Sequence, residues 1–419
     1  MTAPPTGALP TGAPGPADPP AVYLDHAATT PMLASVAATM AEEFTRTGNA
    51  SSLHTPGRRA RRTVEEARER IGDALGARAS EVVFTAGGTE SDNLAVKGMF
   101  WARRADDSGR TRVLASAVEH RAVLDTVRWL GDVAGADVDW LPVDRTGTVH
   151  PDTVADRIAA DGGPDSVALV TCMWANNEVG AVQPIEEIAD RAAAAGVPLH
   201  TDAVQAVGAL PVDFAAVGGV HALSLSGHKL GGPVGAGALL LRRTTALVPL
   251  QHGGGQEREV RSGTLDVPAI AGLAVAVEAA VAGRAEHARR LAPLRDQLVT
   301  RVRRIDPGVV VGGELAPAGR LPGTAHLTFP GCEGDSLLLL LDAAGIACST
   351  GSACSAGVPE PSHVLTAMGY DDELARGSLR FSLGRGSGPA DVDRLVAVLP
   401  EVLDRARAAG VAARRRAVV

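Results

Sequence analysis

Cysteine is scarce in this chain: its 419 residues contain four, Cys172, Cys332, Cys348 and Cys354, at irregular spacing. So few cysteines argue against a disulfide scaffold and indicate a reducing compartment, so we expect a cytoplasmic protein. No Cys-x-x-Cys pair occurs, which leaves out the usual signature of a structural zinc site. Aromatic residues are also scarce, at 3% of the chain, but this reflects a compositional bias and says little about function.

A surplus of positive charge is missing as well. The chain has 40 basic and 48 acidic residues, a net charge of −8. It is therefore not built around a broad nucleic-acid-binding face, although a transient RNA partner stays open. No apolar run approaches the ~20 residues that cross a membrane, and the N-terminus lacks the basic and apolar segments of a signal peptide. We expect no membrane attachment and no stable, direct binding of nucleic acid.

The chain is long enough for two or three domain equivalents with a large core. Residues 1–20 consist mainly of Pro, Gly, Ala and Thr, which predicts a disordered tail because they cannot bury enough apolar surface. Residues 410–419 are predicted to form a frayed, basic end. Between these ends, seven apolar runs indicate strands, at residues 81–85, 112–116, 138–141, 166–173, 197–201, 220–225 and 236–241.

Helical patterns separate many of these runs, at residues 60–75, 90–103, 122–133 and 185–195. Near-continuous apolar strands alternating with helices predict an α/β fold with a mainly parallel, seven-stranded sheet covered on both faces. After about residue 285 the pattern changes to long helices with strand candidates at 324–329 and 379–383. We therefore predict a large domain at 36–284, a small α+β C-terminal domain at 285–409, and a segment at 21–35 that packs with the small domain.

Lys229 is the most informative single residue. It stands between the apolar run 220–225 and the glycine-rich stretch 231–237. A lysine just past a buried strand is placed to form a Schiff base with an aldehyde such as pyridoxal phosphate (PLP). Taken alone, it is more often an ordinary surface lysine. The prediction therefore depends on the residues that follow the neighbouring strands, because ligands of open α/β sheets bind beyond the carboxyl ends of the strands.

Several polar residues are predicted to lie at such strand ends. Asp202 could keep the pyridine nitrogen of PLP protonated, or it could simply cap a turn. His120 could stack on a cofactor ring and transfer protons, or it could be an exposed loop residue. Asn176 and Asn177 form either a turn or a platform of hydrogen-bonding groups.

The turn Gly87-Gly88-Thr89 follows a predicted strand and opens a predicted helix. Free N–H groups, the helix dipole and a hydroxyl make such a turn an anion site, although Gly-Thr is also an ordinary N-cap. It is not a Walker loop, because no Gly-x4-Gly-Lys-Ser/Thr motif occurs in the chain.

Two residues of the predicted small domain add further chemistry. Cys354 lies in a stretch of small residues without an apolar anchor, which predicts an exposed, mobile cysteine suited to nucleophilic attack and sulfur handling. Arg380 is a charge inside a strand pattern, so it needs a carboxylate partner from the protein or from a substrate.

Taken together and in chain order, these motifs resemble those of cysteine desulfurases in the class V aminotransferase superfamily. These are PLP-dependent enzymes with the aspartate aminotransferase fold. The resemblance extends from Tyr23 to about Arg385. The motifs that carry it are Tyr23-Leu24-Asp25-His26-Ala27-Ala28-Thr29-Thr30-Pro31, Gly48-Asn49-Ala50-Ser51-Ser52-Leu53-His54, Gly88-Thr89-Glu90-Ser91-Asp92-Asn93, Asn176-Asn177-Glu178-Val179-Gly180, Ser226-Gly227-His228-Lys229, Arg261-Ser262-Gly263-Thr264 and the stretch 349–354.

The resemblance implies a role for each candidate residue. Lys229 matches the Schiff-base lysine, Asp202 the partner of the pyridine nitrogen, and His120 the stacked histidine. Further cofactor contacts, near the phenolic oxygen or around the phosphate, are implied for Asn177, Gln205, Gly88, Thr89, Ser226, His228 and Thr264. The contact at Thr264 comes from the other subunit in this family, which implies a homodimer.

The resemblance also implies the reaction. Arg380 would bind the substrate carboxylate, Asn177 would lie near the substrate, and Cys354 would take sulfur from L-cysteine as a persulfide, leaving L-alanine. The loop Ser-x-Gly-Ser-Ala-Cys resembles a subgroup with a longer, mobile catalytic loop. Members of that subgroup pass sulfur to iron–sulfur scaffolds and tRNA thiolation enzymes. In that setting Cys354 could ligate a transferred iron–sulfur cluster, although no resident metal is expected.

Some positions depart from the family pattern, and other functions stay open. Gly88 stands where alanine is common and Val204 where threonine is common, and the N-terminal tail lies outside the pattern. A selenocysteine lyase would share every candidate residue. Another PLP-dependent aminotransferase or lyase would need no Cys354. A non-catalytic scaffold for sulfur assembly is disfavoured by the joint presence of the candidate catalytic residues.

Overall fold

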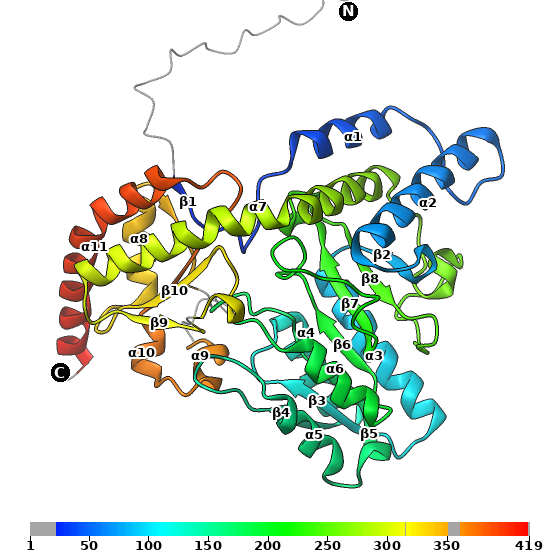
Figure 1. Cartoon of the computed structure of the whole chain (residues 1–419), viewed down its shortest axis with the longest axis horizontal. Coiled ribbons are helices and arrows are strands. Elements are labelled where there is room, and N and C mark those ends of the chain that lie inside the picture. Colours follow the sequence, from blue (N-terminus) through cyan, green and yellow to red (C-terminus); the bar gives the residue numbers. More distant parts are fainter. Residues whose placement is uncertain (1–21, 315, 351–360, 418–419) are drawn as a thin grey trace, which may run out of the picture.

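The structure is a computed structural model that describes residues 22–314, 316–350 and 361–417. Its largest sheet has seven strands in the order β2-β8-β7-β6-β5-β3-β4 (Figure 1). Neighbours from β7 to β4 are parallel, whereas β8 runs antiparallel to both β7 and β2. This confirms the predicted mainly parallel sheet, with strands at Val82–Thr85 (β2), Arg112–Ser116 (β3), Asp137–Leu141 (β4), Val167–Thr171 (β5), Leu199–Asp202 (β6), Val220–Ser226 (β7) and Gly237–Leu241 (β8).

Alternate residues of these strands point to opposite faces of the sheet, and both faces are apolar. In β2, for example, Val82 and Phe84 belong to one hydrophobic cluster and Val83 to another. The cluster that contains Val83 packs under α3 and α4. The cluster that contains Val82 and Phe84 packs under α2, α5, α6 and the first part of α7. These helices span Thr55–Leu75 (α2), Gly88–Asp106 (α3), Arg121–Ala134 (α4), Pro151–Ala159 (α5), Ile185–Ala194 (α6) and Val267–Ile305 (α7).

The second part of the molecule contains a three-stranded antiparallel sheet in the order β12-β10-β9. A separate hydrophobic cluster fills most of this part, whereas α9 and α10 pack in a further cluster with residues of the large sheet edge such as Val118 and Val179. The elements of this second part are Val310–Gly312 (β9), Thr324–Thr328 (β10), Gly334–Ala343 (α8), Ile346–Ala347 (β11), His363–Ala367 (α9), Asp372–Arg376 (α10), Ser378–Ser382 (β12) and Pro389–Ala417 (α11). We call it the small lobe.

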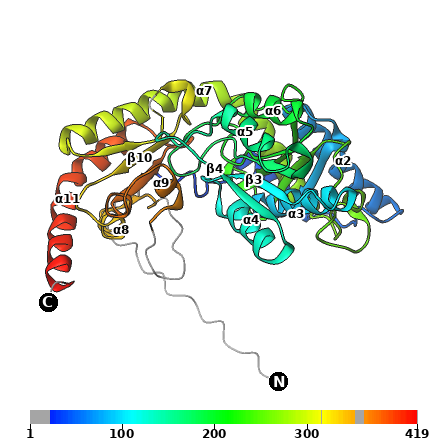
Figure 2. The same cartoon turned by 90° about the horizontal axis from the view of Figure 1, so that it is seen from below.

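Helix α7 joins the two parts and runs without a break through residue 285, where the sequence pattern changes (Figure 2). Its first half contributes Val267 to Ala280 to the large core, and its second half contributes Leu291 to Val302 to the small lobe. By length and composition it is the only described helix that could cross a membrane, but more than half of its most apolar window is buried inside the protein. Such burial is typical of the core helix of a folded domain.

The N-terminal segment returns to the small lobe. Val22–Tyr23 (β1) pairs in parallel with β11, and Val22 and Leu24 are buried in the cluster of the small lobe. Ala34–Phe44 (α1) then packs on α7. Neither these elements nor α5, β9 and β11 are among the predicted elements. Helix α11 continues to Ala417 and so includes residues 410–417, for which the composition predicts a frayed end. The predicted disordered tail lies outside the described residues.

Candidate functional site

The carboxyl ends of the parallel strands bring most of the predicted site residues to one edge of the large sheet. Asp202 is the last residue of β6 and Ser226 the last of β7. Lys229 lies in a short 3-10 helix after β7, and His120 follows β3. Asn177 follows β5 in a turn that faces the small lobe through Gly180.

Lys229 is held by the N-terminal segment. Its Nζ donates hydrogen bonds to the carbonyl oxygens of Ala27, at 2.6 Å, and Ala28, at 2.7 Å. The Nε2 of Gln205 donates to the same Ala27 oxygen at 2.9 Å. Burial and the nearby Arg380 lower the pKa of Lys229 to about 8. A substantial fraction of this amine is therefore uncharged near neutral pH, which is the form that attacks an aldehyde.

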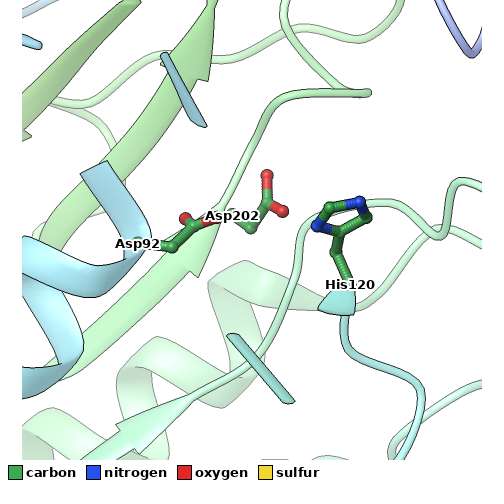
Figure 3. A group of neighbouring side chains, drawn as sticks. All are labelled: Asp92, His120 and Asp202. Carbon is green, nitrogen blue, oxygen red and sulfur yellow. The ribbon is translucent and has the colours of Figure 1, made fainter. Parts of the chain in front are cut away.

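Asp202 lies in a cluster of titratable groups (Figure 3). Its carboxylate is directed toward the His120 ring, and Asp92 lies on its other side. One ligand atom from each of the three residues falls within 4.8 Å of the others. Burial and Asp92 raise the pKa of Asp202 to about 6, whereas His120 opposes the rise. One Asp202 oxygen accepts the N–H of Val204 at 2.8 Å.

His120 has a defined tautomer. It begins α4 as its N-cap, and its Nδ1 accepts the N–H of Ala122 at 3.1 Å. The proton of the neutral ring therefore sits on Nε2. Loss of solvent around the ring lowers the pKa of His120, although the nearby Asp202 acts in the opposite direction. The result is a neutral, planar imidazole on the open side of Asp202, as a stacking residue requires.

Beneath Asp202, the structure adds buried residues whose roles the sequence analysis missed. His200, fully buried, joins Thr171 Oγ1 at 2.9 Å to Ser224 Oγ at 3.0 Å. Burial lowers the pKa of His200 to about 4, so its ring is neutral. Burial also raises the pKa of Asp92 to about 7 and that of Glu119 well above its usual range. The only available signal was proximity in sequence: His200 and Glu119 lie beside or near Asp202 and His120, and Asp92 lies in the quoted Gly88 motif.

The predicted phosphate cradle forms where α3 begins. Gly87 has φ 148° and makes no side-chain cap, so the first N–H groups of α3 face outward without a capping side chain. A Cβ atom on Gly88 would approach Val204 Cγ2 to 2.9 Å and Ser226 Cβ to 3.7 Å, so glycine allows the turn to pack closely against Val204. Thr89 is exposed beside it. The helix N-terminus with its free donors suits a phosphate.

The remaining cradle candidates flank this turn less directly. His228 contacts Thr29 Oγ1 through Nδ1 at 3.3 Å. Thr264 is exposed on the loop before α7. The same loop is fastened near the start of α3 by Arg261, whose Nε donates to Glu90 at 2.8 Å. In the single chain, Thr264 therefore stands at the rim of this region.

Arg380 reaches the site from the small lobe. Its guanidinium is almost fully buried, and it donates to the backbone oxygen of Asn177 at 2.9 Å and to Asp25 Oδ1 at 2.7 Å. Asp25 supplies the carboxylate partner that the sequence predicts for this charge. Arg380 and Asn177 thus come together across the two parts of the molecule, and a carboxylate ligand could compete with Asp25 for the guanidinium.

The predicted nucleophile, Cys354, lies outside the described residues. The other three cysteines are buried. Burial raises the pKa of Cys348 to about 12 and that of Cys172 well above its usual range. Because a thiolate is the reactive form, neither of these two could take the place of Cys354 as the nucleophile.

The residues at this sheet edge fit PLP. The first N–H groups of α3 have no capping side chain and can bind an anion, and Asp202 offers a buried carboxylate to a pyridine nitrogen. Lys229 supplies an amine of lowered pKa within the same edge. A metal ion could in principle use the oxygen and nitrogen atoms of Asp92, His120 and Asp202, but with its raised pKa Asp92 is a poor ligand near neutral pH.

Comparisons with known proteins place this chain in one family. The family model described as aminotransferase class-V matches residues 22–395. An "IscS-like cysteine desulfurase" of Mycobacterium tuberculosis is 57% identical over 93% of this chain and 98% of the relative. A "Cysteine desulfurase IscS" of Methanosarcina thermophila is 45% identical over 92% and 93%. A solved "NIFS-LIKE PROTEIN" superimposes with a TM-score of 0.83 at 34% identity, covering 92% of this chain and 99% of that one.

Proposed function

Because the chain belongs to the aminotransferase class-V family, we propose that it is a PLP-dependent cysteine desulfurase. It would convert L-cysteine to L-alanine and receive the sulfur as a persulfide on Cys354. The observation that carries this proposal is the arrangement of Lys229, Asp202 and Arg380. A lysine of lowered pKa and a buried acid meet at one sheet edge, and a guanidinium from the small lobe reaches the adjacent Asn177.

PLP, when bound, supplies an electron sink for the substrate carbon next to the carboxylate. Lys229 would anchor it through a Schiff base, Asp202 would hold its pyridine nitrogen protonated, and His120 would stack on its ring. Gly88, Thr89, Ser226 and His228 would surround its phosphate, with Thr264 of a second subunit. Gln205 and Asn177 would lie near its phenolic oxygen.

The chain's own residues would handle the substrate and its protons. Arg380 would exchange Asp25 for the substrate carboxylate, because both are anions that fit its planar fork. Lys229 would accept the Cα proton of the substrate. Its pKa of about 8 suits this task, since a base works best when its pKa lies near the working pH.

The sulfur step balances without an external oxidant. The Cys354 thiolate attacks the substrate sulfur, an S–S bond forms and the C–S bond breaks. The electron pair of the broken bond stays with the substrate carbon, which takes up a proton and leaves as alanine. The persulfide would then pass to an acceptor protein such as an iron–sulfur scaffold or a tRNA thiolation enzyme, from a homodimer in the cytoplasm.

The test is to incubate the purified protein with L-cysteine and a reductant and to measure alanine and sulfide. Lys229→Ala should abolish both products. Cys354→Ser should also abolish them while the PLP absorbance of the protein remains. Unchanged alanine production in Cys354→Ser would exclude the persulfide route and favour a PLP lyase or aminotransferase that needs no thiol. Parallel assays with selenocysteine would identify a selenocysteine lyase by its higher turnover.

A further inference from the structure

Ser362 and His363, at the start of α9, form hydrogen bonds with residues adjacent in sequence to the candidate site residues Asn177 and His120. The Oγ of Ser362 donates to Oε2 of Glu178 at 2.5 Å, and Glu178 follows Asn177. The Nε2 of His363 donates to the backbone oxygen of Glu119 at 2.9 Å, and Glu119 precedes His120. Ser362 and His363 stand at the start of α9, whose Val364 and Leu365 pack in one cluster with Val118 and Val179 of the large sheet edge.

The turn that carries Asn177 is built around polar groups. The side-chain oxygen of Asn176 accepts the N–H groups of Glu178 and Val179, both at 2.9 Å. The amide of Asn176 donates to the backbone oxygen of Val118 at 2.9 Å. Asn176 therefore shapes the turn and ties it to the loop before His120. The Asn177 side chain itself makes no hydrogen bond to any described residue.

Three residues that follow α7 in the chain contact this turn, at residues 177, 178 and 180. Arg380 binds the backbone oxygen of Asn177, Ser362 binds the side chain of Glu178, and Leu321 donates its N–H to the oxygen of Gly180 at 2.8 Å. Glu178 and Ser362 are both buried. A buried polar group that loses its partner costs more than an exposed one. The Glu178–Ser362 bond is therefore a strong constraint on where the turn lies.

We propose that Glu178 and Ser362 are positioning residues of the substrate site. Their hydrogen bond holds the turn so that the free Asn177 amide faces the ligand beside the Arg380 guanidinium, and the bond from His363 to Glu119 holds the loop of His120 in the same way. This inference rests on the proposed function for the identity of the ligand, an α-amino acid. A purely structural bond between the lobes would instead affect stability alone.

The holoenzyme with Ser362→Ala, Glu178→Leu or Glu178→Gln tests the proposal. Ser362→Ala and Glu178→Leu each remove the bond. Glu178→Gln keeps an amide oxygen that accepts from Ser362. Ser362→Ala also removes the cap of α9, because its Oγ accepts from Val364 and Leu365. The matched control is Asp371→Ala, which removes the cap of the neighbouring α10 at Leu374 without touching the turn.

The readouts are the absorbance change of the bound cofactor on titration with L-alanine, the KM and kcat for L-cysteine, the PLP content and the thermal midpoint. We expect Ser362→Ala and Glu178→Leu to weaken L-alanine binding and raise KM about tenfold, with kcat changed less than threefold and PLP content unaltered. In Glu178→Gln, the affinity for L-alanine and the KM for L-cysteine should stay within threefold of the parent values. Asp371→Ala should lower only the thermal midpoint.

Unchanged L-alanine binding and KM in Ser362→Ala, with a lowered thermal midpoint, would overturn the proposal. If Glu178→Leu does not fold, Ser362→Ala and Glu178→Gln still decide it. The L-alanine titration needs no sulfur chemistry. A parent protein that binds L-alanine but makes none from L-cysteine would contradict the proposed function, while the effect of Ser362→Ala on L-alanine binding would still decide the positioning role.

Discussion

Oδ1 of Asp92 lies 3.5 Å from Nε2 of His200, beneath the carboxylate of Asp202. Within residues 22–314, 316–350 and 361–417, this Asp92 oxygen has no hydrogen-bond partner, and both side chains are fully buried. His200 is neutral because burial lowers its pKa to about 4. A charged Asp92 would therefore face the Asp202 carboxylate with no cation between them, and burial raises the pKa of Asp92 to about 7, so the carboxylic acid is its more stable form below that pH.

Asp92 should make the stability of the cofactor-free protein depend on pH. Its pKa rises from 3.8 in the unfolded chain to about 7 in the fold. Such a group contributes stability that is complete below pH 3.8 and lost as pH rises through 7. The free energy of unfolding, measured by chemical denaturation, should decrease from pH 5 to pH 8 in the parent. In Asp92→Asn this decrease should be smaller by on the order of 2–4 kcal/mol. Equal pH dependence in both proteins would show that Asp92 is ionised or compensated.

Lys229 should react with PLP at a rate set by a pKa near 8. At pH 7.5 about a quarter of an amine with this pKa is uncharged, against about one in a thousand for an unperturbed lysine. On addition of PLP to the cofactor-free protein, the initial rate of Schiff-base absorbance should rise with pH and level off above about pH 9. A lysine-containing peptide is the control, and its rate should keep rising to beyond pH 10. A protein rate that follows the peptide would show that burial does not shift this group.

Arg380 should resist replacement by lysine. Its fork binds Asn177 and Asp25 at the same time, and an ammonium group cannot reproduce this planar geometry. Arg380→Lys should raise the KM for L-cysteine about tenfold or more, because a charge-assisted bidentate contact is worth a few kcal/mol. Arg104→Lys offers a control, since the Arg104 guanidinium donates to the backbone oxygens of Ala134 and Gly135 at the end of α4. Equal effects in both variants would contradict a specific role for Arg380.

A glycine at residue 259, in the loop before Thr264, should relieve backbone strain and stabilise the protein. Glu257, Arg258 and Glu259 are three consecutive residues with φ of 47°, 57° and 64°, a left-handed conformation that is unfavourable for residues with a Cβ. Glu257 is anchored by a buried ion pair with Arg68 and by the N–H of Phe84, whereas Glu259 is exposed. Glu259→Gly should therefore raise the free energy of unfolding by up to about 1 kcal/mol.

A matched glycine change separates this gain from a general effect. Glu186→Gly lies in the first turn of α6, where φ is negative, so it should lower the free energy of unfolding by about 1 kcal/mol. Thermal or urea unfolding of both variants measures the difference. A loss of stability in Glu259→Gly would show that the loop carries no strain at this residue.

The predictions from the sequence succeed where the information is local. Most strands of the large sheet are short apolar runs, β4 and β6 being the more polar ones, and the residues that follow a strand are its neighbours in the chain. This is why Asp202, His120 and Lys229 could be placed at strand ends from the sequence, and why the edge they share followed from parallel pairing. The conformation of the Gly87-Gly88 turn is equally local, because it depends on the absence of a side chain.

Partners that are distant in the chain could not be predicted in the same way. Asp25 and Arg380 lie 355 residues apart, and Glu178 and Ser362 lie 184 apart. Nothing in either segment names the other, because such pairs arise only when two separately packed lobes meet along α7. The sequence by itself therefore determined the sheet, its functional edge and the chemical types of the site residues. Only the tertiary structure decided which buried charged groups are neutralised and which residues are their partners. It also decided how the small lobe holds the turn of Asn177, since burial and long-range contacts set the energies of these interactions.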